Sequence, residues 1–202
     1  KAWCEENSIE FTYKKPATDA DTDRAASMEE AIEEGYNVLV LPGYAFANAI
    51  VSVAPTYPDV KFVALDVAEF DLVTANGGAA LELDNFYSGV YQEELSGYMA
   101  GYAAVKLGYK NLGFLGGMAV PAVIRFGYGF VQGANAAAKE LGKTVEMKYS
   151  WLHGASFSAS AELQTMLEGW YSTGTQVVFA CGGSMCTSAF AAAGANNGKV
   201  IG

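Results

Sequence analysis

The stretch Phe114-Leu-Gly-Gly-Met-Ala-Val-Pro-Ala-Val-Ile-Arg-Phe-Gly-Tyr-Gly-Phe-Val-Gln-Gly133 decides the fold of this chain. An apolar strand expected over residues 111–115 runs into it and breaks at Gly116-Gly117. After Pro121 the spacing of the apolar side chains predicts a helix. Its apolar face consists of Val123, Phe126, Phe130, Ala134 and Ala137. A strand, a glycine break and a helix start form the junction at which open α/β sheets hold ligands, so the stretch predicts an α/β protein that binds one.

The same alternation of strand and helix runs through most of the chain. Strands are expected at residues 9–13, 38–41, 60–66, 86–91, 111–115, 144–149 and 176–181, and a further one begins at 199. Helices are expected at about residues 21–35, 46–57, 93–107, 123–141, 160–172 and 184–195. Residues 38–41 are a continuous apolar run that stops at Pro42-Gly43, which is typical of a buried parallel strand. Strands separated by helices predict βαβ units and parallel sheets.

The alternation is interrupted between residues 67 and 85, which contain Gly77-Gly78 and no clear apolar period. This interruption predicts two lobes, an N-terminal lobe of residues 1–86 and a C-terminal lobe of residues 87–202. The chain is expected to cross from one to the other at about residues 84–89. Each lobe should have its own parallel sheet with helices on both faces.

The composition fits a folded protein of this kind. Of the 202 residues, 51% are hydrophobic, which is enough to bury a core in each of two small lobes. The formal net charge is −10, and no cluster of Lys or Arg offsets it locally. A nucleic acid would be repelled over most of such a surface, so a nucleic-acid partner is not expected.

No membrane-spanning helix is expected. The longest apolar stretch, residues 95–107, is shorter than the roughly 20 residues that cross a bilayer. Its Gly97-x-x-x-Gly101 spacing suits the close packing of helices inside a core. The first residues, Lys1-Ala-Trp-Cys-Glu-Glu6, lack the apolar segment of a signal peptide, and we expect the sequence to be a mature or trimmed piece.

The usual enzyme motifs are not found. No phosphate-binding loop is present, and Gly127, Gly129 and Gly133 lie inside a predicted helix with the wrong spacing for a dinucleotide site. Residues 154–158 lack the second glycine of a nucleophile elbow. The one histidine, His153, cannot supply a histidine-rich metal site. We therefore expect no cofactor, no metal and no enzymatic activity.

The three cysteines are Cys4, Cys181 and Cys186. An odd count with one pair five residues apart is not a disulfide framework. We expect small core-lining residues and no structural disulfide.

Residues 116–130 also resemble a known family. The pattern Gly-Gly-Met-x-x-Pro-x-x-x-Arg-Phe-x-Tyr-Gly-Phe is similar to the signature of the basic membrane protein family, solute-binding lipoproteins of bacterial ABC importers, several of which capture purine nucleosides. Further stretches that are similar to this family are residues 35–43, 57–63, 92–101 and 178–183. Family members begin with an earlier strand and continue past Val200-Ile-Gly202, so the resemblance implies a chain truncated at both ends.

The resemblance implies a type I periplasmic-binding-protein-like fold whose two lobes close on a small ligand. It implies an extracytoplasmic lipoprotein, attached to the cell membrane, that binds its ligand as a monomer and delivers it to an ABC permease. An intracellular ligand sensor or transcription-linked regulator on the same fold is the alternative. A third class, an α/β enzyme, would need acid and base residues outside this sequence.

The expected ligand site consists of loops that follow strands. Its residues are Gly43, Tyr44, Met118, Phe157, Gly182, Gly183 and Ser184, and the Gly154–Phe157 loop contributes as well. Glycine lets a ligand approach the backbone, and the amides of Ser184 and Met185 at a helix start can donate to a ligand oxygen. The alternative is that these glycines only close tight turns.

Phe157 and Ala119 bear on the identity of the ligand. Phe157 is a large ring in a loop of small polar residues, and the resemblance implies that it stacks on a nucleobase, with Tyr44 as a second wall. The alternative is that Phe157 packs between the loop and the core. Nucleoside-binding members carry an aspartate where this chain has Ala119, so a ribose would be held less strongly here.

Overall fold

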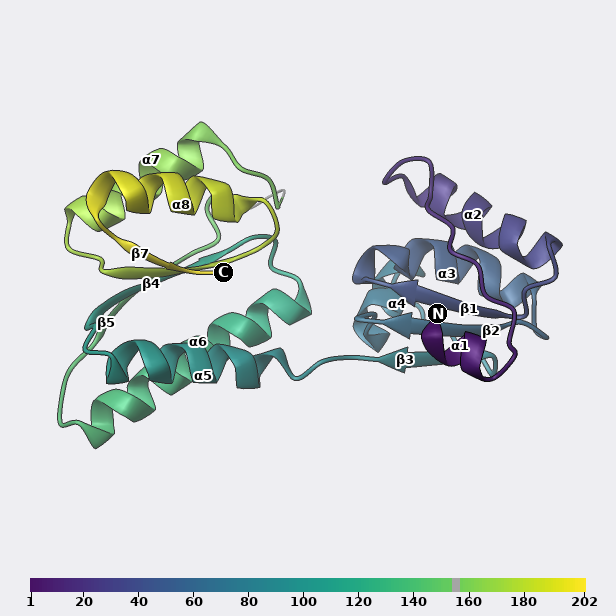
Figure 1. Ribbon diagram of the computed structural model, residues 1–202, viewed down its shortest axis with the longest axis horizontal. Coiled ribbons are helices and arrows are strands. Elements are labelled where there is room, and N and C mark those ends of the chain that lie inside the picture. The colour runs from purple at the N-terminus through teal and green to yellow at the C-terminus, as the bar shows by residue number, and fades with distance from the viewer. Residues whose placement is uncertain (154–156) are drawn as a thin grey trace. The chain divides into compact units, whose positions relative to one another are not determined.

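The computed structural model describes residues 1–153 and 157–202 (Figure 1). The chain forms two compact units, Lys1–Tyr91 (unit 1) and Gln92–Gly202 (unit 2). Each unit has a parallel sheet of its own, so the predicted α/β class with separate parallel sheets is confirmed. The predicted contribution of residues 154–156 to the ligand site lies outside the described residues.

Unit 1 contains a three-stranded sheet in the order β1-β2-β3. Its elements are α1 (Ala2–Glu6), α2 (Asp21–Glu33), β1 (Val38–Pro42), η1 (Tyr44–Phe46), α3 (Ala47–Val53), η2 (Ala54–Thr56), β2 (Lys61–Leu65), α4 (Glu69–Ala75) and β3 (Phe86–Gly89). The core includes Met28 of α2, Ile50 of α3 and Phe62 of β2, which are almost completely buried. The helix expected at residues 21–35 is therefore confirmed, with its apolar face on this core.

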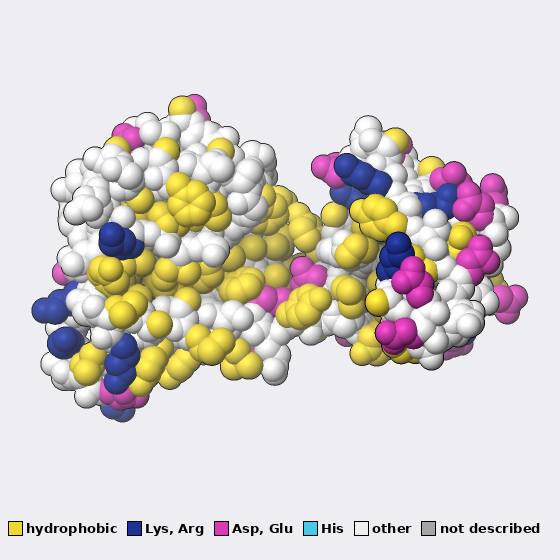
Figure 2. Space-filling model, in the orientation of Figure 1, with side chains coloured by type: hydrophobic (Ala, Val, Ile, Leu, Met, Phe, Trp, Pro, Cys, Tyr) yellow, Lys and Arg dark blue, Asp and Glu magenta, His cyan; other side chains and the backbone are white. Residues whose placement is uncertain are grey.

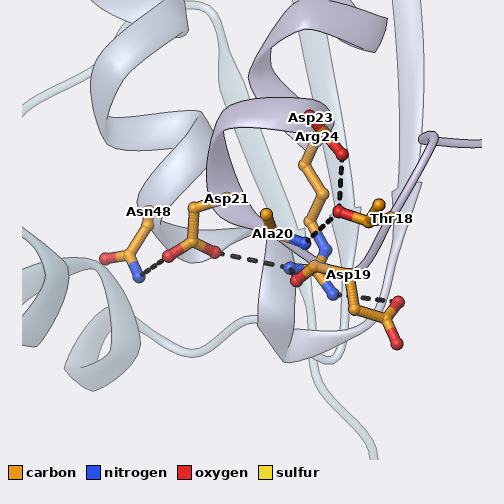
Figure 3. Close-up of polar contacts among 7 residues, drawn as sticks. All are labelled: Thr18, Asp19, Ala20, Asp21, Asp23, Arg24 and Asn48. Carbon is orange, nitrogen blue, oxygen red and sulfur yellow. Dashed lines mark hydrogen bonds and ion pairs between the residues drawn. The ribbon is translucent and has the colours of Figure 1, made fainter.

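The start of α2 is tied to its surroundings by polar contacts (Figure 3). The Asn48 amide of α3 donates to Oδ2 of Asp21 at 2.8 Å. The Arg24 guanidinium donates to the backbone carbonyl of Asp19 and lies over the Phe46 ring, 5.9 Å from its centroid. These contacts hold the start of α2 against α3 and η1, the short helix that follows the carboxyl end of β1.

β1 is only half buried, although its apolar run is typical of a buried strand. Leu39 and Leu41 face the core, whereas Val38 and Val40 expose 53% and 60% of their surface. β1 lies at the edge of the sheet with β2 as its one neighbour among the described strands. The prediction of a fully buried strand was wrong because successive side chains of a strand point to opposite faces of the sheet, and the face that carries Val38 and Val40 is exposed.

Two further differences from the sequence prediction occur in unit 1. Residues 9–13 do not form the expected strand, and they pair with no strand among the described residues. A strand needs a neighbour to satisfy its backbone groups, which an alternating pattern cannot supply. Residues 67–85 contain α4, which was not predicted because Leu72 is its one buried side chain.

The connection between the units follows β3. Phe86 to Gly89 pair with Phe62 to Leu65 of β2, so the whole strand belongs to the sheet of unit 1. The structure therefore divides the chain after Tyr91, five residues later than the boundary predicted from the sequence.

Unit 2 contains a four-stranded parallel sheet in the order β5-β4-β6-β7. Its elements are α5 (Glu93–Lys106), β4 (Asn111–Gly116), α6 (Pro121–Glu140), β5 (Glu146–Ser150), α7 (Ala161–Ser172), β6 (Val177–Cys181), α8 (Met185–Asn196) and β7 (Lys199–Ile201). Every helix and strand predicted for this part of the chain is present. The helices lie on both faces of the sheet, α5 and α6 on one and α7 and α8 on the other (Figure 1).

The alternating side chains of the central strands build one core on each face of this sheet. Phe114 of β4 and Phe179 of β6 pack on the side of α5 and α6, where the Phe130 ring of α6 joins them. Leu115 and Val178, one position along each strand, pack on the side of α7 and α8. Both cores reach the carboxyl ends of β4 and β6, where ligand-binding loops are expected.

α5 and α6 approach each other through glycines. A Cβ added to Gly97 or Gly101 would collide with the backbone carbonyl of Phe126 or Phe130 on α6. In the opposite direction, a Cβ on Gly129 or Gly133 would collide with backbone of α5. The prediction that the Gly97-x-x-x-Gly101 spacing serves helix packing inside a core is confirmed.

The outer face of α5 is also apolar. Figure 2 shows hydrophobic side chains along this helix, and Leu95 and Met99 expose 54% and 64% of their surface. At 14 residues, the helix is shorter than the roughly 20 residues that cross a bilayer. Within residues 1–153 and 157–202, no helix combines the length and the apolar character needed to cross a membrane.

Candidate ligand-binding site

The turns after β4 and β6 lie side by side at the carboxyl edge of the unit 2 sheet. Gly116 at the end of β4 is paired with Cys181 at the end of β6. The Gly117 amide then donates to the Cys181 carbonyl oxygen at 3.0 Å. The turns that follow β4 and β6 therefore begin next to each other. Five of the seven predicted site residues belong to this unit: Met118, Phe157, Gly182, Gly183 and Ser184.

Phe157 fits into the space that the glycines of these turns leave open. A Cβ on Gly117 or on Gly182 would collide with its ring. Its backbone carbonyl accepts hydrogen bonds from the Ser184 hydroxyl at 3.0 Å and from the Met185 amide at 3.2 Å. Phe157 is half-buried and packs on both cores of unit 2. Because it belongs to the loop after β5, its contacts hold this loop against the turn after β6.

The turn after β6 leads directly into α8. Gly183 has a φ of +41°, in the left-handed region that favours glycine. The Met185 amide donates to the carbonyls of Gly182 and Phe157, so it is not available to a ligand, and the expectation that it donates to one was wrong. The Ser184 side chain is exposed at this edge, and its hydroxyl is held by the bond to Phe157.

The turn after β4 presents small and flexible side chains. Met118 and Ala119 are both exposed, and Met118 leaves 37% of its surface open. The methyl group of Ala119 offers no hydrogen bond. The exposed side chains of this turn can therefore offer only apolar contact to a ligand.

The remaining two predicted residues belong to unit 1. Gly43 follows β1 with a φ of +113°, and its amide donates to the Leu65 carbonyl at the end of β2 at 2.8 Å. Tyr44 opens η1 and is half-buried. These residues lie at the carboxyl edge of the unit 1 sheet, so the predicted site consists of one loop in unit 1 and a cluster of turns in unit 2.

Glu93 and Arg125 form an ion pair that the sequence did not reveal. The Arg125 Nε donates to Oε2 of Glu93 at 2.6 Å, and Glu93 exposes only 5% of its surface. The pKa of the Cys181 thiol is raised to about 12 by burial and, to a smaller extent, by Cys186 and Glu93. The contact with Arg125 places the carboxylate beside the second turn of α6, the helix that follows the end of β4. An Arg and an acidic residue at two helix starts were the available signals, but their pairing depends on how the helices pack.

Trp151 is a second residue that the sequence did not reveal. It follows β5, and its ring lies over Gly116, where an added Cβ would collide with it. The ring also contacts those of Phe114 and Tyr149, with centroids 6.0 Å and 5.6 Å away. Trp151 thus extends the aromatic core to the carboxyl edge of β4.

These features suit the binding of a small molecule. Within the described residues, no three His, Cys, Asp or Glu side chains are grouped so that they could hold a metal ion. The edge offers instead aromatic rings, exposed backbone at glycine turns and one buried carboxylate. That combination of apolar lining with few polar groups is typical of ligand pockets.

Comparison with known proteins places these features in context. The Bmp family, described as "ABC transporter substrate-binding protein PnrA-like", matches residues 2–202. The "ABC transporter nucleoside-binding protein BmpA" of Lactococcus lactis subsp. cremoris is 28% identical over 202 residues, which are 98% of this chain and 52% of that protein. An uncharacterized lipoprotein of Pyrococcus abyssi is 27% identical over 146 residues, which are 72% of this chain and 34% of that protein.

Solved structures agree on the fold. A solute-binding protein of an ABC transporter system from Aeropyrum pernix K1 matches with a TM-score of 0.71 at 22% identity, over 98% of this chain and 54% of that one. This likeness confirms the α/β solute-binding-protein fold predicted from the sequence. The chain spans about half the length of the BmpA relative and of this structure.

Proposed function

Because the chain belongs to the Bmp family of PnrA-like ABC transporter substrate-binding proteins, we propose that it is part of the extracytoplasmic solute-binding component of an ABC importer. The match to residues 2–202 is the observation that carries this proposal. The proposed partners are a small solute and a membrane permease. The lipoprotein name of the Pyrococcus abyssi relative supports attachment to the cell membrane.

The ligand that we propose is a purine nucleoside or a related heterocycle. The nucleoside-binding name of the Lactococcus lactis relative supports this class. The half-buried Phe157 ring beside the Gly117 and Gly182 turns supports stacking of a flat ring on the unit 2 part of the site. For Tyr44, which belongs to unit 1, a contact with the ligand remains a proposal from the family resemblance. The methyl group of Ala119 implies weaker dependence on a ribose hydroxyl than in nucleoside-binding relatives.

Calorimetry on the full-length protein tests this function. We would titrate it with guanosine, inosine and adenosine, with their 2′-deoxy forms, and with the free bases. Arabinose and an amino acid serve as unrelated solutes. We expect binding of at least one purine compound, with little loss for the deoxy form. A sugar or amino acid that binds more tightly than every purine would overturn the ligand class.

A further inference from the structure

Glu93 has a carboxylate oxygen without a hydrogen-bond partner. Its Oε2 is held by Arg125, but its Oε1 is shielded from solvent and accepts no hydrogen bond from any described residue. Glu93 exposes only 5% of its surface. Buried carboxylate oxygens in folded proteins nearly always accept hydrogen bonds, because the water they lose must be replaced. The structure therefore lacks a donor at this position.

The position of Glu93 indicates where the donor comes from. Glu93 is the first residue of α5, and Arg125 lies in the second turn of α6, the helix that follows the turn after β4. The 2.6 Å contact with Arg125 places the carboxylate beside the second turn of α6, which begins just after the carboxyl end of β4. The free oxygen thus lies at the same sheet edge as the proposed ligand turns.

The charge of Glu93 is already balanced, which restricts the chemistry of the donor. Arg125 places a positive charge 2.6 Å from Oε2, so the carboxylate already has a cationic partner. A neutral N–H or O–H group can complete the set, and a further cation is not required. Because the oxygen is shielded from solvent, a group of the solute can reach it only after the atoms that cover it move aside.

We propose that Glu93 is a specificity-determining residue of the ligand site, and that its Oε1 accepts a hydrogen bond from an N–H or O–H group of the bound solute. This inference rests on the proposed function. Ala119 gives the turn after β4 no polar side chain. Glu93, at the start of α5, supplies a hydrogen-bond acceptor at the same edge of the sheet.

The test combines a variant with ligands that lack single donors. Calorimetry compares the full-length wild-type protein with Glu93→Gln, using guanosine, 2′-deoxyguanosine, 3′-deoxyguanosine and 1-methylguanosine. Because Arg125 requires an oxygen, the amide nitrogen of the glutamine faces the solute and cannot accept. We expect Glu93→Gln to weaken guanosine binding by about 10- to 100-fold. The analogue that lacks the donor should bind the wild type about 10- to 100-fold more weakly than guanosine does. With Glu93→Gln, that analogue and guanosine should bind equally well. The identity of this analogue shows whether the donor belongs to the base or to the sugar.

Glu140→Gln is the matched control. It removes a carboxylate that pairs with Lys106 at 2.7 Å between the same two helices, but at the far end of α6 and in an exposed position. We expect it to bind every compound as the wild type does. Thermal unfolding of both variants reports whether the fold is retained.

The outcomes separate this inference from the proposed function. If the wild type binds none of the purine compounds, the proposed function fails and the role of Glu93 fails with it. If the wild type binds and Glu93→Gln keeps the same affinity or the same analogue penalties, Glu93 is only structural and the function stands. Should the variant not fold, a crystal structure of the wild type with guanosine decides: a water at Oε1 in place of a guanosine donor overturns the inference.

Discussion

The ring of Phe157 has two roles that can be measured separately. It packs on the cores of unit 2 between two glycine turns, and it remains partly exposed at the proposed ligand site. Packing contributes to the stability of the protein without ligand. Stacking contributes only when a flat ligand is bound.

Phe157→Ala is therefore expected to weaken purine binding by roughly 1–3 kcal/mol through the loss of stacking. Calorimetry measures the change in affinity, and thermal unfolding of the ligand-free protein measures the loss of packing. Phe190→Ala is the control, because Phe190 lies on α8 and exposes 56% of its surface. An affinity equal to that of the wild type would remove Phe157 from the site.

The Cys181 thiol should be inert in the folded protein. Its pKa is raised from 9.0 to about 12, mainly by burial. The unfolded thiol loses its proton at lower pH than the folded one, so this group's contribution to stability is present below about pH 9 and is lost as the pH rises toward 12.

Labelling with iodoacetamide at pH 8, followed by peptide mass spectrometry, tests the thiols. We expect Cys4 to be alkylated in the native protein and Cys181 only after denaturation, because the thiolate is the reactive form. Denatured protein without reductant should show three free thiols, since all three cysteines are unpaired in the structure. Equal labelling rates for Cys4 and Cys181 would contradict the burial of Cys181.

At the scale of elements, the contact between α5 and α6 is the least tolerant part of the fold. Gly97→Ala places a methyl group on the backbone carbonyl of Phe126, which cannot move without shifting the helix. We expect a loss of about 2–3 kcal/mol in the free energy of unfolding, measured by urea denaturation.

Gly194→Ala is the matched control for this substitution. Gly194 lies in α8 and has no neighbouring atom within 4 Å of an added Cβ. The same change there should stabilise the protein by up to about 1 kcal/mol, because alanine favours the helix. Equal effects at the two positions would show that the helices are less closely packed than described.

Elements with strong periodicity could be predicted from the sequence, and those that depend on a neighbour could not. In the helix predicted at about residues 160–172, the apolar spacing of Leu163, Met166, Leu167 and Trp170 is typical of one helix face, and in α7 these side chains pack on one core. Residues 9–13 alternate as a strand does but find no partner. The apolar Val38 and Val40 predict a strand buried on both faces, although both side chains lie on an exposed face of the sheet.

The candidate site could be predicted in part for the same reason. Glycine turns after strands are visible in the sequence, so the turns at Gly116-Gly117 and Gly182-Gly183 could be predicted, and their role in ligand binding stays a prediction. The pair of Glu93 and Arg125 joins residues 32 positions apart. Its formation depends on the packing of two helices, which no local pattern records.

At the scale of the whole molecule, the connection after β3 is the expected site of cleavage. Val90 and Tyr91 expose 52% and 60% of their surface, and the division between the compact units follows Tyr91. In the 202-residue chain, chymotrypsin at low concentration should cut after Tyr91 and leave residues 92–202 as a stable fragment. Mass spectrometry identifies the product, and early cleavage inside α6 or β4 would contradict the compactness of unit 2.

Residues 92–202 should also fold when expressed alone. This unit has two cores of its own on the faces of one sheet. We expect a cooperative thermal transition by circular dichroism. A gradual loss of signal would show that unit 2 depends on the rest of the protein.

The glycine contact between α5 and α6 also fixes the axial alignment of the two helices. Phe126 touches Gly97 and Glu94 touches Gly129 through backbone atoms, and the ion-paired residues precede Phe126 and Glu94 by one position each. A slip of one helical turn would move one helix along the other by about 5.4 Å, far more than a 2.6 Å ion pair tolerates. The close approach at four glycines therefore fixes the position of the Glu93 carboxylate along α6. These glycines are Gly97, Gly101, Gly129 and Gly133. A bulkier residue at any of them should impair solute recognition even where the altered helix pair still folds.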